Sequence, residues 1–114
     1  MPNEYYVRTG SSGNFATDKV VFDGPCRFCG GTFNSNCSAA SHIVVYDSDG
    51  VTPEDNANTI AGFYFPAGGG CESLTMPDIE WAIDCLHGIS VKFNGTGTNA
   101  VVWYSEPLTK QYPD

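Results

Sequence analysis

The sequence predicts an all-β protein, a single β-sandwich or jelly-roll-like domain of about six to eight short antiparallel strands. Two observations support this prediction. Short apolar runs rich in Val, Ile, Phe and Tyr recur along the chain, and no long amphipathic helical pattern separates them. The 114 residues also include 13 Gly and 7 Pro, which supply the turns that many short strands need.

The clearest strand signal lies near the C-terminus. Residues 86–93 and 100–104 form two runs of strand type, and Asn94-Gly95-Thr96-Gly97 stands between them. Asn and Gly tolerate the positive φ that tight hairpin loops require. The sequence therefore predicts that these two runs are joined as a hairpin in an antiparallel sheet.

The N-terminal part divides into an arm and the start of the domain. Residues 1–18 are polar with a Gly-Ser loop signal, which predicts an N-terminal arm or edge segment, and residues 19–114 form the sandwich domain. Residues 19–22 are the first strand of that domain, closed by an Asp-Gly-Pro turn. Residues 26–33 are the next strand, in which Gly30-Gly31 predicts a β-bulge or a close backbone approach.

The middle of the chain carries the densest β-branched run. Residues 42–46 read His-Ile-Val-Val-Tyr and predict a central strand, which an acidic turn and a polar loop follow. Residues 59–65 predict another strand. Over residues 77–83 a helical turn opened by Pro77 is one alternative, but apolar residues at every second position favour a strand.

The charge balance argues against two classes of partner. Thirteen acidic and five basic residues give a formal net charge of −8, which repels nucleic-acid phosphates and anionic lipid headgroups. The basic residues are scattered singly, and no apolar run approaches the roughly twenty residues of a membrane span. We therefore expect neither a nucleic acid nor a membrane as partner. The N-terminus lacks the features of a secretory signal, which predicts synthesis in a cytosol.

Five cysteines leave three structural interpretations open. Cys26-x2-Cys29 followed by Cys37 and His42 has the ligand types of a tetrahedral zinc site, whereas on a strand Cys26 and Cys29 would instead be small apolar residues that face opposite sides. Alternatively, Cys71 or Cys85 forms a disulfide with a cysteine of residues 26–37. The pairing stays open, and the odd number leaves at least one thiol unpaired within the chain.

Catalysis and calcium binding receive less support. Cys29 or Cys37 with His42 or His87 supplies the atoms of a thiol nucleophile and its base, but no catalytic motif surrounds them, so we predict no enzyme, no catalytic residues and no cofactor. The acidic residues after the central strand lack the spacing of a calcium loop and predict a solvated loop. These are Asp47, Asp49, Glu54 and Asp55.

The aromatic residues predict buried or interface positions more than a sugar-binding surface. The residues concerned are Phe63, Tyr64, Phe65, Trp81, Trp103 and Tyr104.

Three segments carry a resemblance to a known group of proteins. They are a Gly-Pro-Cys segment that enters a strand with Gly-Gly (residues 24–31), an Ile-Val-Val-Tyr-Asp strand that ends in an acidic turn (43–50), and Leu-His-Gly-Ile-Ser-Val through Gly-Thr-Gly-Thr-Asn-Ala-Val-Val-Trp-Tyr (86–104). Over residues 20–104 this order resembles small β-sandwich virion proteins of tailed bacteriophages, of the capsid cement or decoration type.

The resemblance implies a structural protein of the virion. Such a protein decorates or cements the outer capsid surface by binding neighbouring major capsid protein subunits, commonly as a homotrimer. One alternative is a tail, neck or fibre component that binds a host-surface carbohydrate or receptor, and another is a small zinc-binding or thiol-dependent domain.

Overall fold

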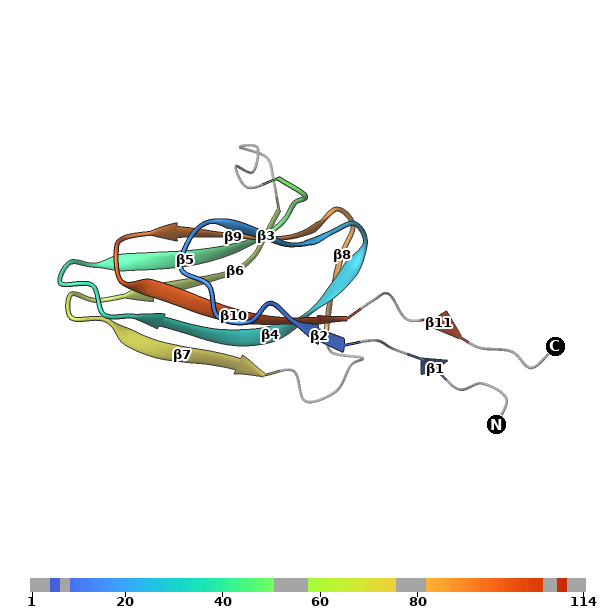
Figure 1. The fold of residues 1–114 in the computed structure, drawn as a ribbon, viewed down its shortest axis with the longest axis horizontal. Coiled ribbons are helices and arrows are strands. Elements are labelled where there is room, and N and C mark those ends of the chain that lie inside the picture. Colours follow the sequence, from blue (N-terminus) through green and yellow to red (C-terminus); the bar gives the residue numbers. More distant parts are fainter. Residues whose placement is uncertain (1–4, 7–8, 51–57, 76–81, 106–108, 111–114) are drawn as a thin grey trace.

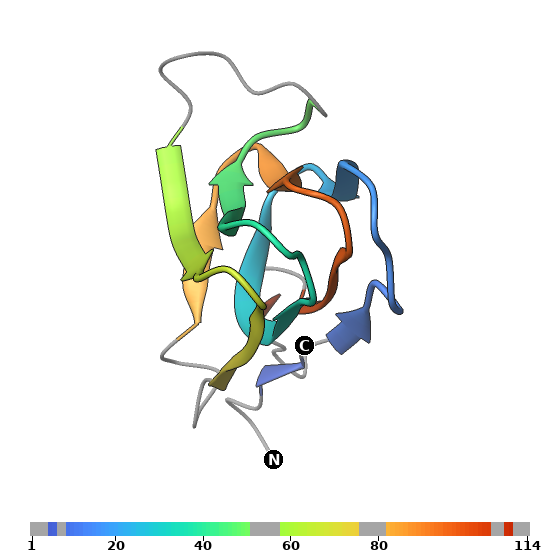
Figure 2. The ribbon, with the colours of Figure 1, turned by 90° about the vertical axis from the view of Figure 1, so that its left-hand side faces the viewer.

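Two antiparallel sheets pack face to face and enclose one apolar core (Figures 1 and 2). The structure is a computed structural model that describes residues 5–6, 9–50, 58–75, 82–105 and 109–110. A sheet of five strands and a sheet of four strands make up the two layers, and every strand pair is antiparallel. The prediction of an all-β sandwich is therefore confirmed.

The first sheet is built around the ten-residue strand β4. Its order is β2 (Thr9–Ser11), β10 (Thr98–Ser105), β4 (Cys26–Ser35) and β7 (Gly70–Thr75), and the short strand β8 (Ile83–Cys85) also pairs with β4. The second sheet has the order β3 (Lys19–Asp23), β9 (Gly88–Asn94), β5 (Ser41–Asp47) and β6 (Asn58–Phe65).

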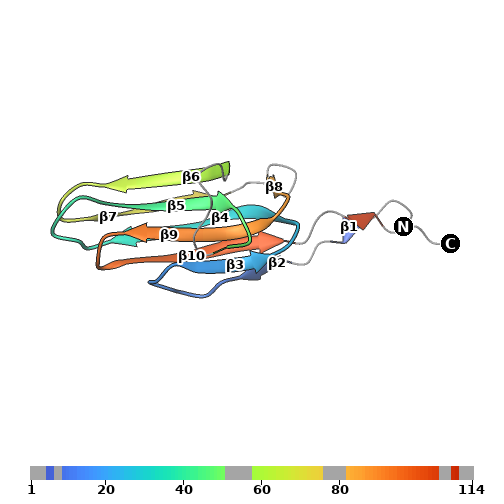
Figure 3. The ribbon, with the colours of Figure 1, turned by 90° about the horizontal axis from the view of Figure 1, so that it is seen from above.

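A separate two-stranded ribbon joins the two ends of the chain. It consists of β1 (Tyr5–Tyr6) and β11 (Thr109–Lys110), paired antiparallel. Figures 1 and 3 show this ribbon beyond one end of the sandwich, along its long axis. The molecule measures 58 × 27 × 19 Å along its principal axes.

Alternation along the central strands places the core between the sheets. In β5 every second residue, from Ser41 to Asp47, is buried, and the residues between them are half-buried. The prediction of a central strand at residues 42–46 is confirmed, because β5 has β9 on one side and β6 on the other. Phe33 of β4 stacks on Phe63 of β6 with ring centroids 4.0 Å apart, which ties the two layers together.

The predicted hairpin of residues 86–104 is wrong in its pairing. Both strands exist, but β9 pairs with β3 and β5 whereas β10 pairs with β2 and β4, so residues 95–97 cross from one sheet to the other. The crossing is closed by distant residues: Asn36 N–H donates to the Gly97 carbonyl at 3.0 Å, and Cys37 Sγ donates to the Thr96 carbonyl. Residues 94–97 suit a hairpin loop as well as they suit this crossing. The pairing is determined instead by strands that lie far away in the sequence.

The two glycines of β4 act as predicted. Phe28 and Gly30 oppose the consecutive residues Tyr104 and Trp103, so Cys29 is the extra residue of a β-bulge. Gly30 has a φ of 113°, and a Cβ on Gly31 would collide with the backbone carbonyl of Val101. The prediction of a bulge and a close backbone approach is confirmed.

Other elements differ in detail from the sequence predictions. The strand β7 was not predicted, because Gly70-Cys71-Glu72-Ser73 shows little alternation. Of the strand predicted over residues 77–83, residues 77–81 lie outside the described residues and Ile83 begins β8. Residues 1–18 contribute β2 at the edge of the first sheet, and Phe15 forms an isolated bridge with Ala100.

The part of the chain that the structure describes contains no helix of the length and apolar character that a membrane span requires.

Candidate functional site

The outer side of the second sheet presents a continuous set of polar and aromatic side chains. They occupy the positions of β5, β6 and β9 that alternate with core positions, because neighbouring residues of a strand face opposite sides. We call this set the His42 face. It consists of His42, Val44, Tyr46, Tyr64, Lys92 and Asn94.

Strand register brings these residues together. His42 lies opposite Asn94 on one side and Tyr64 on the other, and Val44 lies opposite Lys92. The rings of His42 and Tyr64 are 5.2 Å apart, and Tyr64 is 76% exposed. A row that runs from the exposed Tyr64 through the half-buried His42 to the exposed Asn94 therefore crosses three strands.

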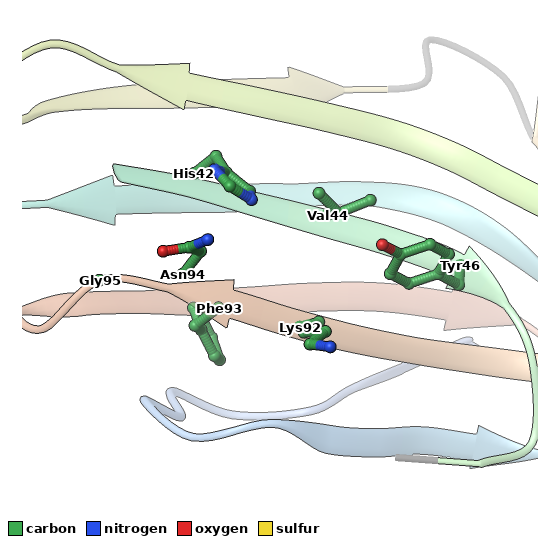
Figure 4. A pocket seen from close by; sticks show the side chains of 7 residues that line it. All are labelled: His42, Val44, Tyr46, Lys92, Phe93, Asn94 and Gly95. Carbon is green, nitrogen blue, oxygen red and sulfur yellow. The ribbon is translucent and has the colours of Figure 1, made fainter. Parts of the chain in front are cut away.

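A hollow of about 330 Å³ lies on the His42 face between β5 and β9 (Figure 4). Its lining combines the imidazole of His42, the phenol of Tyr46, the ammonium of Lys92 and the amide of Asn94 around Val44. These groups donate and accept hydrogen bonds in several directions. Tyrosine in particular is frequent at binding surfaces, because it offers an apolar ring and a polar tip.

At the end of the sandwich, Asp47 holds the turn that precedes β9. Its Oδ2 accepts the Leu86 N–H at 3.0 Å, and its Oδ1 accepts the His87 N–H at 2.9 Å and the Gly88 N–H at 3.3 Å. Asp47 is buried, and three backbone donors around one carboxylate satisfy its charge. The acidic residue that ends β5 is thus a structural anchor between distant segments.

The same contacts set the pKa of Asp47. Burial opposes ionisation and favours a higher pKa, but the three N–H donors of residues 86–88 and the nearby His87 together outweigh burial and lower the pKa below its usual value. A carboxylate with a lowered folded-state pKa contributes stability above its unfolded-state pKa of about 3.9, and this contribution is lost as the pH falls through the folded-state value.

The Asp47→Asn variant is expected to unfold with a free energy about 2 to 3 kcal/mol below that of the unchanged protein at neutral pH, because the amide places an N–H where an acceptor is needed. As the pH falls below about 4, the difference should shrink, because the carboxylate of the unchanged protein is then protonated as well. Urea unfolding at a series of pH values measures both effects. Asp49→Asn is the control, because Asp49 is exposed, and a difference that stays constant into strong acid would contradict this role of Asp47.

The structure separates the residues of the zinc hypothesis. Cys26 begins the ten-residue β4 and Cys37 follows its end, so roughly 30 Å of strand lies between them. Cys29 is displaced by the bulge and lines a hollow of about 450 Å³ with Trp103 on the outer side of the first sheet, while His42 lies on the second sheet. Among the described residues, no three metal-ligating side chains gather.

The thiol–histidine pairs do not come together either. Cys37 is buried and its thiol donates to the backbone carbonyl of Thr96, and Cys29 donates to the carbonyl of Arg27. His42 contacts Tyr64 instead, and His87 is exposed in the turn after β8. The described hydrogen bonds thus include none between a cysteine and a histidine.

The remaining acidic and aromatic residues singled out from the sequence lie in different environments. Asp49 is exposed, whereas Glu54, Asp55 and Trp81 lie outside the described residues. The aromatic residues of β6 alternate as core and surface, because Phe65 is buried, Phe63 stacks in the core and Tyr64 points outward.

The His42 face was not singled out from the sequence. The alternation in residues 42–46 indicates that His42, Val44 and Tyr46 share one side of a strand, and this signal was available. Nothing in the sequence indicates that Lys92 and Asn94 stand beside them, because that neighbourhood depends on the pairing of β5 with β9.

A scan of family models finds none that matches this chain, and a search of curated proteins finds no similar sequence.

Proposed function

We propose that this chain is a structural virion protein of a tailed bacteriophage that decorates or cements the outer capsid surface. In this role it binds neighbouring major capsid protein subunits and performs no catalysis. The observation that carries the proposal is the His42 face, a broad sheet surface with exposed aromatic and hydrogen-bonding side chains. The sequence resemblance over residues 20–104 supports the same role.

The His42 face has the composition of a protein-binding surface. Tyr46 and Tyr64 offer aromatic area, Val44 an apolar centre, and Lys92 and Asn94 polar groups around it. Interfaces of this kind concentrate binding energy in a few aromatic side chains near their centre. A sheet adds little backbone ordering cost on binding, because its strands are already held by the core beneath them.

Sheet edges and charge are compatible with docking on a lattice. In the described part of the chain, the outermost strands of the two sheets are β2, β3, β6, β7 and the short β8, and an edge strand can accept a strand of a neighbouring subunit. The formal net charge of −8 favours a positively charged partner surface, since complementary charge speeds encounter and selects the partner.

Binding to empty heads of the matching bacteriophage tests the proposal. The purified chain should cosediment with the heads, and electron microscopy should show many copies at symmetry-related positions. The His42→Ala/Tyr64→Ala double variant should bind at least tenfold more weakly, about the effect of losing one or two central interface residues.

Trp103→Ala is the matched control, because Trp103 is a partly exposed aromatic on the outer side of the other sheet. It should bind like the unchanged chain. Loss of binding in the control but not in the double variant would place the docking surface on the first sheet. A chain that stays monomeric and does not bind heads would overturn the proposal altogether.

The proposal includes a homotrimer as the bound form. Sedimentation equilibrium of the free chain and copy number in the particle measure it, and a particle with single copies at each position would contradict it.

The hollow on the His42 face favours one second candidate, a tail, neck or fibre protein that binds a host-surface carbohydrate. Tyr46, Lys92 and Asn94 surround this hollow with the donors and acceptors that sugar hydroxyls require. Location distinguishes the two candidates: a few copies at one vertex together with glycan binding would favour the second.

A further inference from the structure

The strand β8 places two buried cysteines opposite each other. Cys26 of β4 and Cys85 of β8 are direct partners in the antiparallel register, although they are far apart in the sequence. Directly opposed residues of antiparallel strands have Cα atoms about 4.5 to 5.5 Å apart, which lies within the range of about 4.4 to 6.8 Å that disulfides span. Both residues are 2% exposed, and the Cys85 thiol donates to the Ile83 carbonyl of its own strand at 3.7 Å.

Two sets of polar contacts hold the backbone around Cys85 in this position. On the β8 side, Arg27 Nε lies 2.9 Å from Asp84 Oδ1, and Arg27 Nη2 donates to the Ala82 carbonyl at 3.1 Å. On the other side, Asp47 accepts the N–H groups of the turn that follows Cys85. The backbone on both sides of Cys85 is therefore held in place, which keeps this residue opposite Cys26.

The other three cysteines occupy separate places. Cys37 lies beyond the far end of β4 beneath Thr96, and Cys71 is exposed on β7 opposite Asn34. Cys29 is the bulge residue and lines the hollow of the first sheet. All five thiols are free in the structure, and the register of the described strands opposes no other pair of cysteines, so it favours Cys26 with Cys85 among the pairings that the sequence left open.

We propose that Cys26 and Cys85 form an intramolecular disulfide under oxidising conditions, which closes a redox-dependent clasp between β4 and β8. The clasp is open in a reducing cytosol and closes when the protein meets an oxidant. A virion component moves from the reducing cytosol to oxidising surroundings when the host cell releases the particle; this timing rests on the proposed function. The bridge itself does not depend on that function.

The reaction is a thiol–disulfide exchange with a small-molecule disulfide. One protein thiolate attacks a sulfur of that disulfide, expels the first small thiol and forms a mixed disulfide. The second protein thiolate attacks the protein sulfur of the mixed disulfide and expels the second small thiol. In total the two protein thiols lose two electrons and two protons, and the small disulfide is reduced to two thiols.

Burial sets the pace of this reaction. Attack by either sulfur requires β8 to separate transiently from β4, and β8 is a strand of only three residues. The neighbouring Cys26 thiol, burial and the charge of Asp47 all raise the pKa of Cys85, so little of its thiolate forms while the two strands stay paired.

Oxidation of the full-length chain with oxidised glutathione tests the clasp. The intact mass should fall by two hydrogens, and a peptide map under non-reducing conditions should link the peptides of Cys26 and Cys85. Because the bridge closes a loop of roughly 60 residues, the melting temperature should rise by about 10 °C and fall back after reduction.

Matched double variants assign the bridge. Cys29→Ala/Cys71→Ala should still lose two hydrogens and gain the same melting shift, whereas Cys26→Ala/Cys85→Ala should do neither. If Cys26→Ala/Cys85→Ala does not fold, the peptide map of the unchanged chain still shows whether Cys26 and Cys85 are linked. Free Cys26 and Cys85 after equilibration, a bridge to another cysteine, stable glutathione adducts or a bridge without a melting shift would each overturn the clasp. None of these outcomes depends on binding to phage heads.

Discussion

Replacement of Gly88 by alanine is expected to lower the free energy of unfolding by about 3 to 5 kcal/mol, which is a large share of the stability of a domain of this size. Gly88 has a φ of 148°, a conformation that residues with a side chain rarely adopt. A Cβ at this position would collide with the carbonyl oxygen of Phe22 and lie 3.0 Å from that of Ser48. The backbone around it cannot move freely, because the Gly88 carbonyl accepts the Ser48 N–H and its N–H donates to Asp47.

Gly24→Ala separates the collision from the backbone strain. Gly24 also has a positive φ, 115°, but a Cβ there would meet no atom within 4 Å. Its replacement should cost about 1 to 2 kcal/mol, the strain alone. Chemical denaturation of the two variants measures the difference. Equal losses of unfolding free energy would show that the atoms around Gly88 move to accommodate a Cβ at little cost.

Replacement of Phe33 by alanine is the second change with a large expected effect, about 3 to 5 kcal/mol. The Phe33 ring is fully buried and stacks on Phe63 of the opposite sheet. Truncation removes the contact between the layers and leaves a cavity that the rigid sheets cannot close. Thermal and urea unfolding should both show the loss.

Tyr64→Ala is the control, because Tyr64 follows Phe63 on β6 and points to solvent. Its stability should stay within about 0.5 kcal/mol of that of the unchanged protein. The two variants also separate folding from docking. Under the proposed function, Tyr64→Ala should remain folded and lose affinity for capsids, so a Tyr64→Ala protein that unfolds would undermine the assignment of this side chain to a binding surface.

Local patterns account for much of the fold. The runs at residues 19–22, 26–33, 42–46 and 59–65 are all strands in the structure, because side-chain alternation and turn residues act over a few positions. The same local logic placed the bulge at Gly30-Gly31. It missed β7, whose mixture of small and polar residues carries no comparable signal.

The candidate site depended more strongly on distant contacts. Half of the His42 face follows from the alternation along β5, but Lys92, Asn94 and Tyr64 join it only through strand register. Asp47 was predicted in a solvated loop, yet it is buried against the turn at residues 86–88. No pattern in the sequence indicates that the Asp47 carboxylate accepts the N–H groups of residues 86–88.

The sequence by itself determined that this protein is a sandwich of short strands, because alternation and turn composition are properties of neighbouring residues. Only the tertiary structure decided which strands pair: β9 and β10 lie in different sheets despite a turn suited to a hairpin, and Cys26 lies opposite Cys85. The physical reason is that an apolar strand face can be buried against several partners of similar pattern. The choice among them depends on the sum of register, packing and hydrogen bonds over the whole chain.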